Sequence, residues 1–167
     1  ISKALGAHWT RYFREAFGLF ACVGILGNHS SYERHVSFFV KKLTYNTARI
    51  ALGLQRELRI GHLQWARDEF WADFAVEAMW KMLQLDSPED ILVGNGVCHW
   101  GEEYVEYAFN YFTLRWADHI VFDKSFLRKN EVVKLEVNPA KAERLLGWKK
   151  NRLPFQKHIE LMCDYDY

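Results

Sequence analysis

The sequence contains few prolines, glycines and cysteines, the residue types whose abundance would directly indicate a class of protein. Proline numbers 3 and glycine 10 among 167 residues, so no proline-rich or glycine-rich linker divides the chain. Cysteine numbers 3, an odd count whose spacing suits neither a disulfide framework nor a zinc site, and we expect no bound metal. Because so few cysteines favour a reducing compartment, we expect a cytoplasmic protein, with an organellar complex as the alternative.

A surplus of one charge and long apolar runs are also missing. Lys and Arg number 22 and Asp and Glu 21, which leaves no basic excess for a nucleic-acid surface. No apolar run approaches the roughly 18 residues that a membrane-spanning helix needs. We therefore expect neither a nucleic-acid partner nor a membrane span. The chain starts at Ile1 rather than Met, and we expect processing, trimming or a true start further upstream.

What the sequence does have is apolar and aromatic residues, 50% and 16% of the chain, enough for a packed core. Apolar periodicity, with Gly and Pro as stop signals, predicts helices interleaved with short strands, the pattern of an α/β protein. The expected helices cover residues 3–17, 36–53, 70–85, 102–112, 139–146 and 155–163. The expected strands cover residues 19–26, 57–61, 90–95, 119–123 and 132–137.

The run LFACVGIL, residues 19–26, is apolar or glycine at every position. Such a run predicts a strand covered on both faces, as in parallel sheets, and it needs hydrogen-bonded neighbours on both edges. One interpretation is a small mixed sheet formed with residues 91–94 and 132–137. The other is that most of the sheet is absent from this chain or is supplied by another one.

Several segments, read in order, carry a resemblance to a known family. They are FREAFGLFACVGILGNHSS (13–31), IGHLQWARD (60–68), VEAMWKMLQ (76–84), FLRKNEV (126–132) and KAERLLGWK (141–149). These segments resemble matching stretches of GDP-mannose 4,6-dehydratases, which are extended short-chain dehydrogenase/reductases. The resemblance covers essentially the whole chain.

The resemblance implies the C-terminal part of such an enzyme: the last Rossmann helix and strand plus a small mixed α/β nucleotide-sugar-binding domain. Residues 1–30 would be a remnant of the Rossmann domain. Residues 31–167 would be the substrate domain, with segments that return to the Rossmann sheet. In the family, NADP takes a hydride from sugar C4, water is eliminated across C5 and C6, and the hydride returns to C6. GDP-mannose thereby becomes GDP-4-keto-6-deoxymannose.

The same resemblance assigns ligand residues but no catalytic residue. Lys3, His29 and Arg34 stand where the family contacts NADP. The positions that match GDP-sugar contacts are Asn28, Lys42, Arg67, Arg128 and Glu131. The glycine-rich fingerprint of the dinucleotide site does not occur in the sequence, and the catalytic Tyr would fall before Ile1. We therefore expect this chain alone to be inactive. The alternative is a pseudoenzyme that serves as a structural subunit of a larger assembly.

Departures from the family pattern gather in the expected ligand loops. Ser30 replaces a Glu, Glu33 replaces an Arg, and Glu69-Phe70 replaces Trp-Gly. Arg67 and Arg128 could equally be ordinary ion-pair residues. Aromatic residues at 71, 74, 80, 104, 107 and 109 are expected to serve the core or an interface rather than a cofactor. We also expect a companion polypeptide or host complex to cover residues 19–26.

Overall fold

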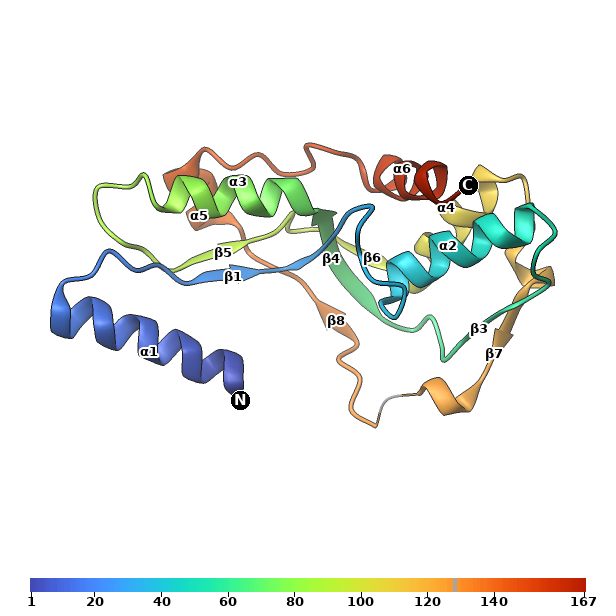
Figure 1. The fold of residues 1–167 in the computed structure, drawn as a ribbon, viewed down its shortest axis with the longest axis horizontal. Helices are drawn as coiled ribbons and strands as arrows, with labels where there is room; N and C mark the ends of the chain where they lie inside the picture. The colour runs from blue at the N-terminus through green and yellow to red at the C-terminus, as the bar shows by residue number, and fades with distance from the viewer. Residues whose placement is uncertain (128) are drawn as a thin grey trace.

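The computed structural model describes residues 1–127 and 129–167, which form an α/β fold of helices and short strands (Figure 1). Its helices are α1 (Ser2–Phe17), α2 (Phe39–Ala51), α3 (Ala72–Met82), α4 (Gly101–Tyr111), α5 (Ala140–Leu146) and α6 (Phe155–Asp166), with short 3-10 turns η1 (Trp116–Asp118) and η2 (Lys124–Phe126). Its strands are β1 (Gly24–Leu26), β2 (Asn28–Ser30), β3 (Leu58–Ile60), β4 (Ala66–Trp71), β5 (Ile91–Val93), β6 (Cys98–Trp100), β7 (Ile120–Phe122) and β8 (Lys134–Leu135). Within the described residues, no helix has the length and apolar character needed to cross a bilayer.

The strands form several small sheets, which belong to two regions of the molecule. β1 pairs with β5 in parallel, and the next strand, β2, pairs with β4 in parallel. β4 also pairs with β6 in an antiparallel and with β8 in a parallel arrangement. A separate parallel pair joins β3 to β7. The chain thus passes from one sheet to the next at the junction of β1 and β2.

Two apolar cores lie on either side of β4 (Figure 1). The larger core packs α2, α4 and α6 around Leu43, Tyr104 and Ile159. The smaller core packs α3 and α5 over β5, with Met82 and Ile91 at its centre. Because β4 contributes Trp71 to the first core and Phe70 to the second, this strand fixes the two regions relative to each other.

α1 lies beside this body without being packed into it, and none of its residues is buried (Figure 1). Polar contacts attach it: Arg11 Nε and Arg14 Nη1 lie 2.6 and 2.9 Å from the Asp90 carboxylate. Its apolar side chains remain exposed, among them Trp9, Phe13 and Phe17. The helix ends at Gly18 in the left-handed conformation, φ 64°, as the stop signal predicts.

The prediction of an α/β fold is confirmed, with differences in several elements. The expected strand over residues 19–26 is regular only at 24–26, where it has one neighbour, β5, among the described residues. In the small mixed sheet proposed for these segments, the pairing of residues 24–26 with 91–93 is confirmed, whereas residues 134–135 pair with β4 instead. The helix expected from residue 70 starts at Ala72, because Phe70 and Trp71 complete β4.

Candidate functional site

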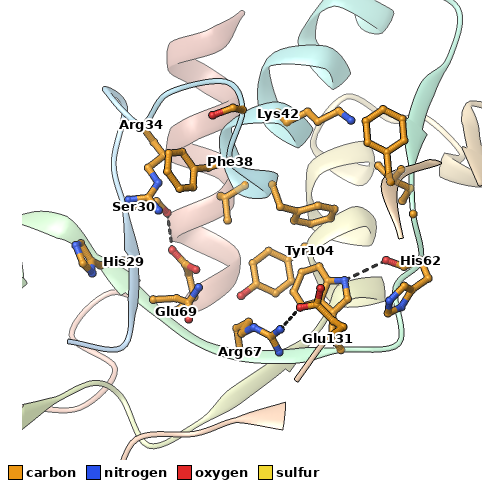
Figure 2. Close-up of a pocket in the computed structure, with 18 residues that line it drawn as sticks. His29, Ser30, Arg34, Phe38, Lys42, His62, Arg67, Glu69, Tyr104 and Glu131 are labelled. Atoms are coloured by element: carbon orange, nitrogen blue, oxygen red, sulfur yellow. Dashed lines mark hydrogen bonds and ion pairs between the residues drawn. The ribbon is translucent and has the colours of Figure 1, made fainter. Parts of the chain in front are cut away.

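A cavity of about 390 Å³ opens where β2, β4 and α2 meet (Figure 2). Asn28, His29 and Ser30 of β2 line one side of it. His29 Nδ1 lies 2.9 Å from the carbonyl oxygen of the preceding Gly27, which fixes the ring orientation. The volume lies within the range of small-molecule sites. The segment that leads from β2 into the next loop therefore forms a wall of a concave site.

The loop after β2 and the start of α2 contribute two cations. The Arg34 guanidinium carbon lies 3.7 Å from the ring centroid of Phe38. Lys42 Nζ donates to the Arg59 carbonyl oxygen at 2.7 Å and lies 4.0 Å from the Phe126 ring centroid. Burial lowers the pKa of Lys42. Both cations lie against aromatic rings. The part of the cavity that they line therefore combines positive charge with apolar surface.

Alternation along β4 sends neighbouring side chains to opposite sides. Arg67 and Glu69 line the cavity, whereas Asp68 is buried elsewhere. Asp68 accepts backbone hydrogen bonds from Asn95 at 2.8 Å and Gly96 at 2.7 Å. Burial raises the pKa of Asp68, and these hydrogen bonds oppose the shift. Arg67 thus faces the cavity, whereas Asp68 stabilises the surrounding backbone.

Arg67 is held by an ion pair at the cavity edge. Its Nη2 lies 2.5 Å from Glu131 Oε1, and its Nη1 donates to the Ala66 carbonyl oxygen at 2.8 Å. The two charged side chains are 13% and 19% exposed, which is enough for a ligand to reach them. A guanidinium held in this way can present its remaining N–H groups to a phosphate, because its planar fork has five donors.

Glu69 occupies the cavity floor with a buried carboxyl group. Ser30 Oγ donates to Glu69 Oε1 at 2.6 Å and lies 3.0 Å from His158 Nε2 on α6. Burial raises the pKa of Glu69 to about 7, although the Ser30 hydrogen bond and the Arg34 charge act against the shift. Burial lowers the pKa of His158 to about 4. Around neutral pH the histidine is therefore uncharged, and the carboxyl group holds its proton to a higher pH than an exposed glutamic acid does.

Aromatic side chains form the wall opposite β2. Phe39 and Trp65 meet edge to face at 4.7 Å between ring centroids, and Tyr104 of α4 lies 5.2 Å from Trp65. Trp65 Nε1 donates to the His62 carbonyl oxygen at 3.0 Å, which fixes the indole. Tyr104 is fully buried, and burial raises the pKa of its hydroxyl. This wall is mainly apolar, and its rings are inclined to one another.

The structure brings together most of the residues assigned by resemblance. Those that line the cavity are Asn28, His29, Arg34, Lys42, Arg67 and Glu131. Arg128 lies outside the described residues. Lys3, at the start of α1, is not among the lining residues. Of the three residues assigned to NADP, His29 and Arg34 therefore line this cavity and Lys3 does not.

Some lining residues are not assigned from the sequence. The sequence predicts Tyr104 in the core, and it is there, but it also lines the cavity. His62 and Trp65 also line the cavity. The feature of the sequence that could have indicated this is their position just before Arg67 in the segment IGHLQWARD. Among the other aromatic residues, Trp71 and Phe109 are buried as expected, whereas Trp80 is 61% exposed.

Comparisons with known proteins identify the family. The family model described as GDP-mannose 4,6 dehydratase matches residues 1–162. GDP-mannose 4,6 dehydratase 1 of Arabidopsis thaliana is 42% identical over 161 residues, which are 96% of this chain and 44% of that protein. The human GDP-mannose 4,6 dehydratase is 35% identical over 180 residues, covering 97% of this chain and 48% of its own. The chain thus spans about half the length of these relatives.

Solved structures share the fold at lower identity. RMD from Pseudomonas aeruginosa, complexed with NADPH, matches with a TM-score of 0.84 and 19% identity over 95% of this chain and 51% of its own. The UDP-glucose 4-epimerase of Thermus thermophilus, complexed with NAD, matches with a TM-score of 0.81 and 20% identity over 99% of this chain and 52% of its own. The fold is that of part of an extended short-chain dehydrogenase/reductase, and the family match over nearly all of the sequence means that this chain belongs to the GDP-mannose 4,6-dehydratase family.

Proposed function

We propose that residues 1–167 form the nucleotide-sugar-binding part of a GDP-mannose 4,6-dehydratase-like protein, with GDP-mannose as the ligand. The observation that carries the proposal is the convergence of Asn28, Arg34, Lys42, Arg67 and Glu131 on one cavity. These residues come from β2, the following loop, α2, β4 and the segment before β8. Residues that are far apart in the sequence thus meet at one cavity.

The charge and shape of the cavity suit a nucleotide sugar. Arg34, Lys42 and Arg67 place three cations around it, and a diphosphate carries the matching negative charge. The aromatic rings of Phe38, Phe39 and Trp65 offer flat apolar surfaces for a base or a sugar ring. A site that combines mainly apolar walls with few convergent polar groups is typical of small-molecule binding.

The proposed role of this chain is binding, because no catalytic residue is assigned in it. His29 and Arg34 could contribute to an NADP site only together with groups outside residues 1–167. In a complete enzyme, NADP would supply the hydride acceptor and donor. The residues of this chain would hold and orient the nucleotide sugar against it.

A second candidate function is a non-catalytic structural subunit. It is favoured by the acids Glu33 and Glu69 at positions where the family pattern has Arg and Trp. It is also favoured by the Arg67–Glu131 ion pair, since a ligand phosphate must share Arg67 with this carboxylate. The two candidates differ in one measurable property, which is affinity for GDP-mannose.

Calorimetric titration of the protein with GDP-mannose tests the proposal. We expect saturable binding and a loss of about 1.5–3 kcal/mol of binding free energy in Arg67→Ala, the range for hydrogen bonds to charged groups. Arg115→Ala is the matched control, because Arg115 lies in a different region and its side chain is 82% exposed. An unchanged dissociation constant in Arg67→Ala would reject the site. Absence of binding by the parent protein would favour the structural subunit.

We also propose a partner for the surface formed by α1 and β1. The exposed apolar side chains of α1, together with the single strand neighbour of β1 among the described residues, favour a cover that supplies further parallel strands. The occupant is a polypeptide segment outside residues 1–167, equivalent to the half of the structural neighbours that this chain does not match.

A further inference from the structure

The cavity holds a carboxyl group that the family pattern does not have. Glu69 stands where that pattern has Trp, and its side chain lines the cavity although the residue is only 4% exposed. In Figure 2 the carboxyl group of Glu69 lies between Arg34 and Arg67. Burying a carboxylate away from water is costly unless cations or hydrogen-bond donors compensate its charge. The groups around Glu69 therefore decide whether it is charged.

Two groups favour the charged form of Glu69. Ser30 Oγ donates to Glu69 Oε1 at 2.6 Å, and the positive charge of Arg34 acts on the carboxylate from the loop after β2. The Ser30 hydroxyl also lies 3.0 Å from His158 Nε2, but this buried histidine is uncharged near neutral pH and adds no positive charge. The cation that favours the charged form is thus one that a phosphate would also attract.

The titratable side chains around Glu69 come from all the elements that meet at the cavity. Those that line the cavity with it are His29, Arg34, Lys42, His62, Arg67, Tyr104 and Glu131. Asp68, next to Glu69 on β4, raises the pKa of the Glu69 carboxyl group. Burial raises the pKa of the Tyr104 hydroxyl, so this group stays uncharged near neutral pH.

The charges that line the cavity do not balance. With both histidines uncharged, the three cations Arg34, Lys42 and Arg67 face the two carboxyl groups of Glu69 and Glu131. One positive charge is in excess when Glu69 is ionised, and two are in excess when it is protonated. Each phosphate of a nucleotide sugar carries a negative charge, so the protonated form of the cavity complements a diphosphate better.

A bound diphosphate changes the surroundings of Glu69 in one direction. Its negative charge repels the carboxylate, it offsets the charge of Arg34, and it displaces water from the cavity. Each of these changes favours the protonated carboxyl group. We propose that Glu69 takes up a proton from solvent when the cavity binds a diphosphate ligand, which makes the affinity depend on pH. This inference rests on the proposed function and deepens it, because it adds regulation of the same site by protons.

The coupling acts near neutral pH. Burial raises the pKa of Glu69 to about 7 in the protein without ligand. A bound diphosphate raises it further, so between the two values the complex holds a proton that the free protein has released. Binding should therefore weaken as the pH rises through this range.

Calorimetric titration with GDP-mannose in HEPES and in Tris at pH 7 counts the protons taken up, because the two buffers release protons with different heats. GDP-mannose is a suitable probe, since its diphosphate is esterified at both ends and does not titrate near neutral pH. We expect uptake of a fraction of one proton per ligand and a dissociation constant at least about threefold higher at pH 8.5 than at pH 7. Binding without proton uptake would overturn this inference and leave the proposed function standing.

Variants identify the group that takes up the proton. Glu69→Gln imitates the protonated carboxyl group and retains an acceptor for Ser30, so it should abolish the uptake and hold the dissociation constant within about twofold from pH 7 to pH 8.5. His29→Gln and His62→Gln are the matched controls, because both replace a titratable group of the same cavity, and both should retain the uptake.

The outcomes separate this inference from the proposed function. Urea unfolding shows whether Glu69→Gln folds, and the proton count of the parent protein decides the matter without any variant. Uptake that persists in folded Glu69→Gln would overturn the inference and assign the proton to another group. Absence of binding by the parent would reject the proposed function and this inference with it.

Discussion

At the scale of single residues, Glu69 and His158 form a buried pair whose protonation states act in opposite directions. Both are linked through the Ser30 hydroxyl. Arg34 and Asp68 are the charged groups that act on Glu69, the first lowering and the second raising its pKa. The ring of Trp71 packs edge to face on His158 at 5.1 Å. The network is thus closed off from water on one side and open to the cavity on the other.

The signs of the two contributions to stability follow from linkage. The pKa of Glu69 rises from 4.5 to about 7 on folding, so the native state holds a proton that the unfolded state releases. Between these values, stability falls as pH rises. The pKa of His158 falls from 6.5 to about 4, so the unfolded state binds the extra proton and stability rises with pH over that window. Between about pH 4.5 and 6.5 the two slopes nearly cancel.

Replacing either Glu69 or His158 should reveal how the other residue alone makes the free energy of unfolding depend on pH. In Glu69→Gln, the free energy of unfolding should rise from pH 4.5 to 6.5 by about 2 kcal/mol relative to the parent's change, since one proton contributes about 1.4 kcal/mol per pH unit. In His158→Gln it should fall by a similar amount. Urea unfolding at both pH values measures these differences. Parallel pH profiles in the parent and both variants would contradict the opposing pair.

At the scale of elements, β4 is the strand that builds the site and joins the two cores. Its Asp68 side chain binds the backbone N–H groups of Asn95 and Gly96. Gly94 lies so close that a Cβ there would meet Asp68 Oδ2 at 2.7 Å. Only glycine fits at this point without displacing the carboxylate. The loop after β5 is therefore fixed to β4 by side-chain contacts as well as by packing.

Asp68→Asn should lower the free energy of unfolding by about 1–3 kcal/mol, because an amide NH₂ would face a backbone N–H that the carboxylate now satisfies. Asp86→Asn, at an exposed position after α3, is the control and should change stability by less than about 0.5 kcal/mol. Denaturant unfolding measures both. Equal stability of Asp68→Asn and the parent would show that these hydrogen bonds contribute nothing net.

A second element-scale prediction concerns how α1 is attached. Asp90 accepts hydrogen bonds from Arg11, Arg14 and the backbone of Val23. Burial acts to raise the pKa of Asp90, but the arginine hydrogen bonds outweigh it and lower the pKa to about 2. Asp90→Ala should therefore speed amide hydrogen exchange over residues 2–17 while α2 exchange stays unchanged.

Glu89→Ala is the matched control for this experiment. Glu89 is the adjacent acid, but it pairs with Lys141 at 2.8 Å instead of with α1. Exchange in α1 should be the same in this variant as in the parent. An equal rate of α1 exchange in Asp90→Ala would mean that contacts other than this carboxylate hold the helix.

The elements that the sequence predicts well are those with a clear apolar period. The predicted ranges of α2 and α4 lie within a few residues of the observed ones, and α5 ends at Gly147, φ 62°, as its stop signal indicates. The strands β2, β4 and β6 are not predicted, because NHS, ARDEFW and CHW are polar or charged and show no strand periodicity. Their pairing with one another, rather than their own composition, makes them strands. The candidate site residues on them follow from motif resemblance alone.

At the scale of the whole molecule, the 167 residues contain groups suited to binding a ligand but not the groups expected for catalysis. The described cavity contains cations, acids and aromatic rings for a ligand. The 167 residues contain neither a glycine-rich dinucleotide fingerprint nor a Tyr four residues before a Lys at the position of Lys3. We therefore expect no conversion of GDP-mannose by this chain alone with NADP added, assayed by product chromatography. Restored turnover on adding a Rossmann-domain polypeptide would support the dehydratase-like function, and turnover by the isolated chain would contradict the expectation.

The apolar face of α1 determines how the chain behaves alone. Trp9, Phe13 and Phe17 stack along one side of the helix, with centroid distances of 5.9 and 5.5 Å between successive rings, and they remain exposed. Contiguous exposed aromatic surface of this kind is characteristic of an interface. We expect the purified chain to self-associate in sedimentation velocity and to form a single defined complex once a segment that covers α1 and β1 is supplied.

Substitution within this face gives a matched pair of tests. Phe13→Glu should abolish both the self-association and the defined complex, because it places a charge at the centre of the aromatic row. Leu54→Glu, at an exposed apolar residue after α2, should change neither. A monomer with a cooperative melt and no partner would refute the prediction. In that case the aromatic row of α1, and the edge of β1 that has no neighbour among the described residues, would have to be stable in water, which the exposed apolar area argues against.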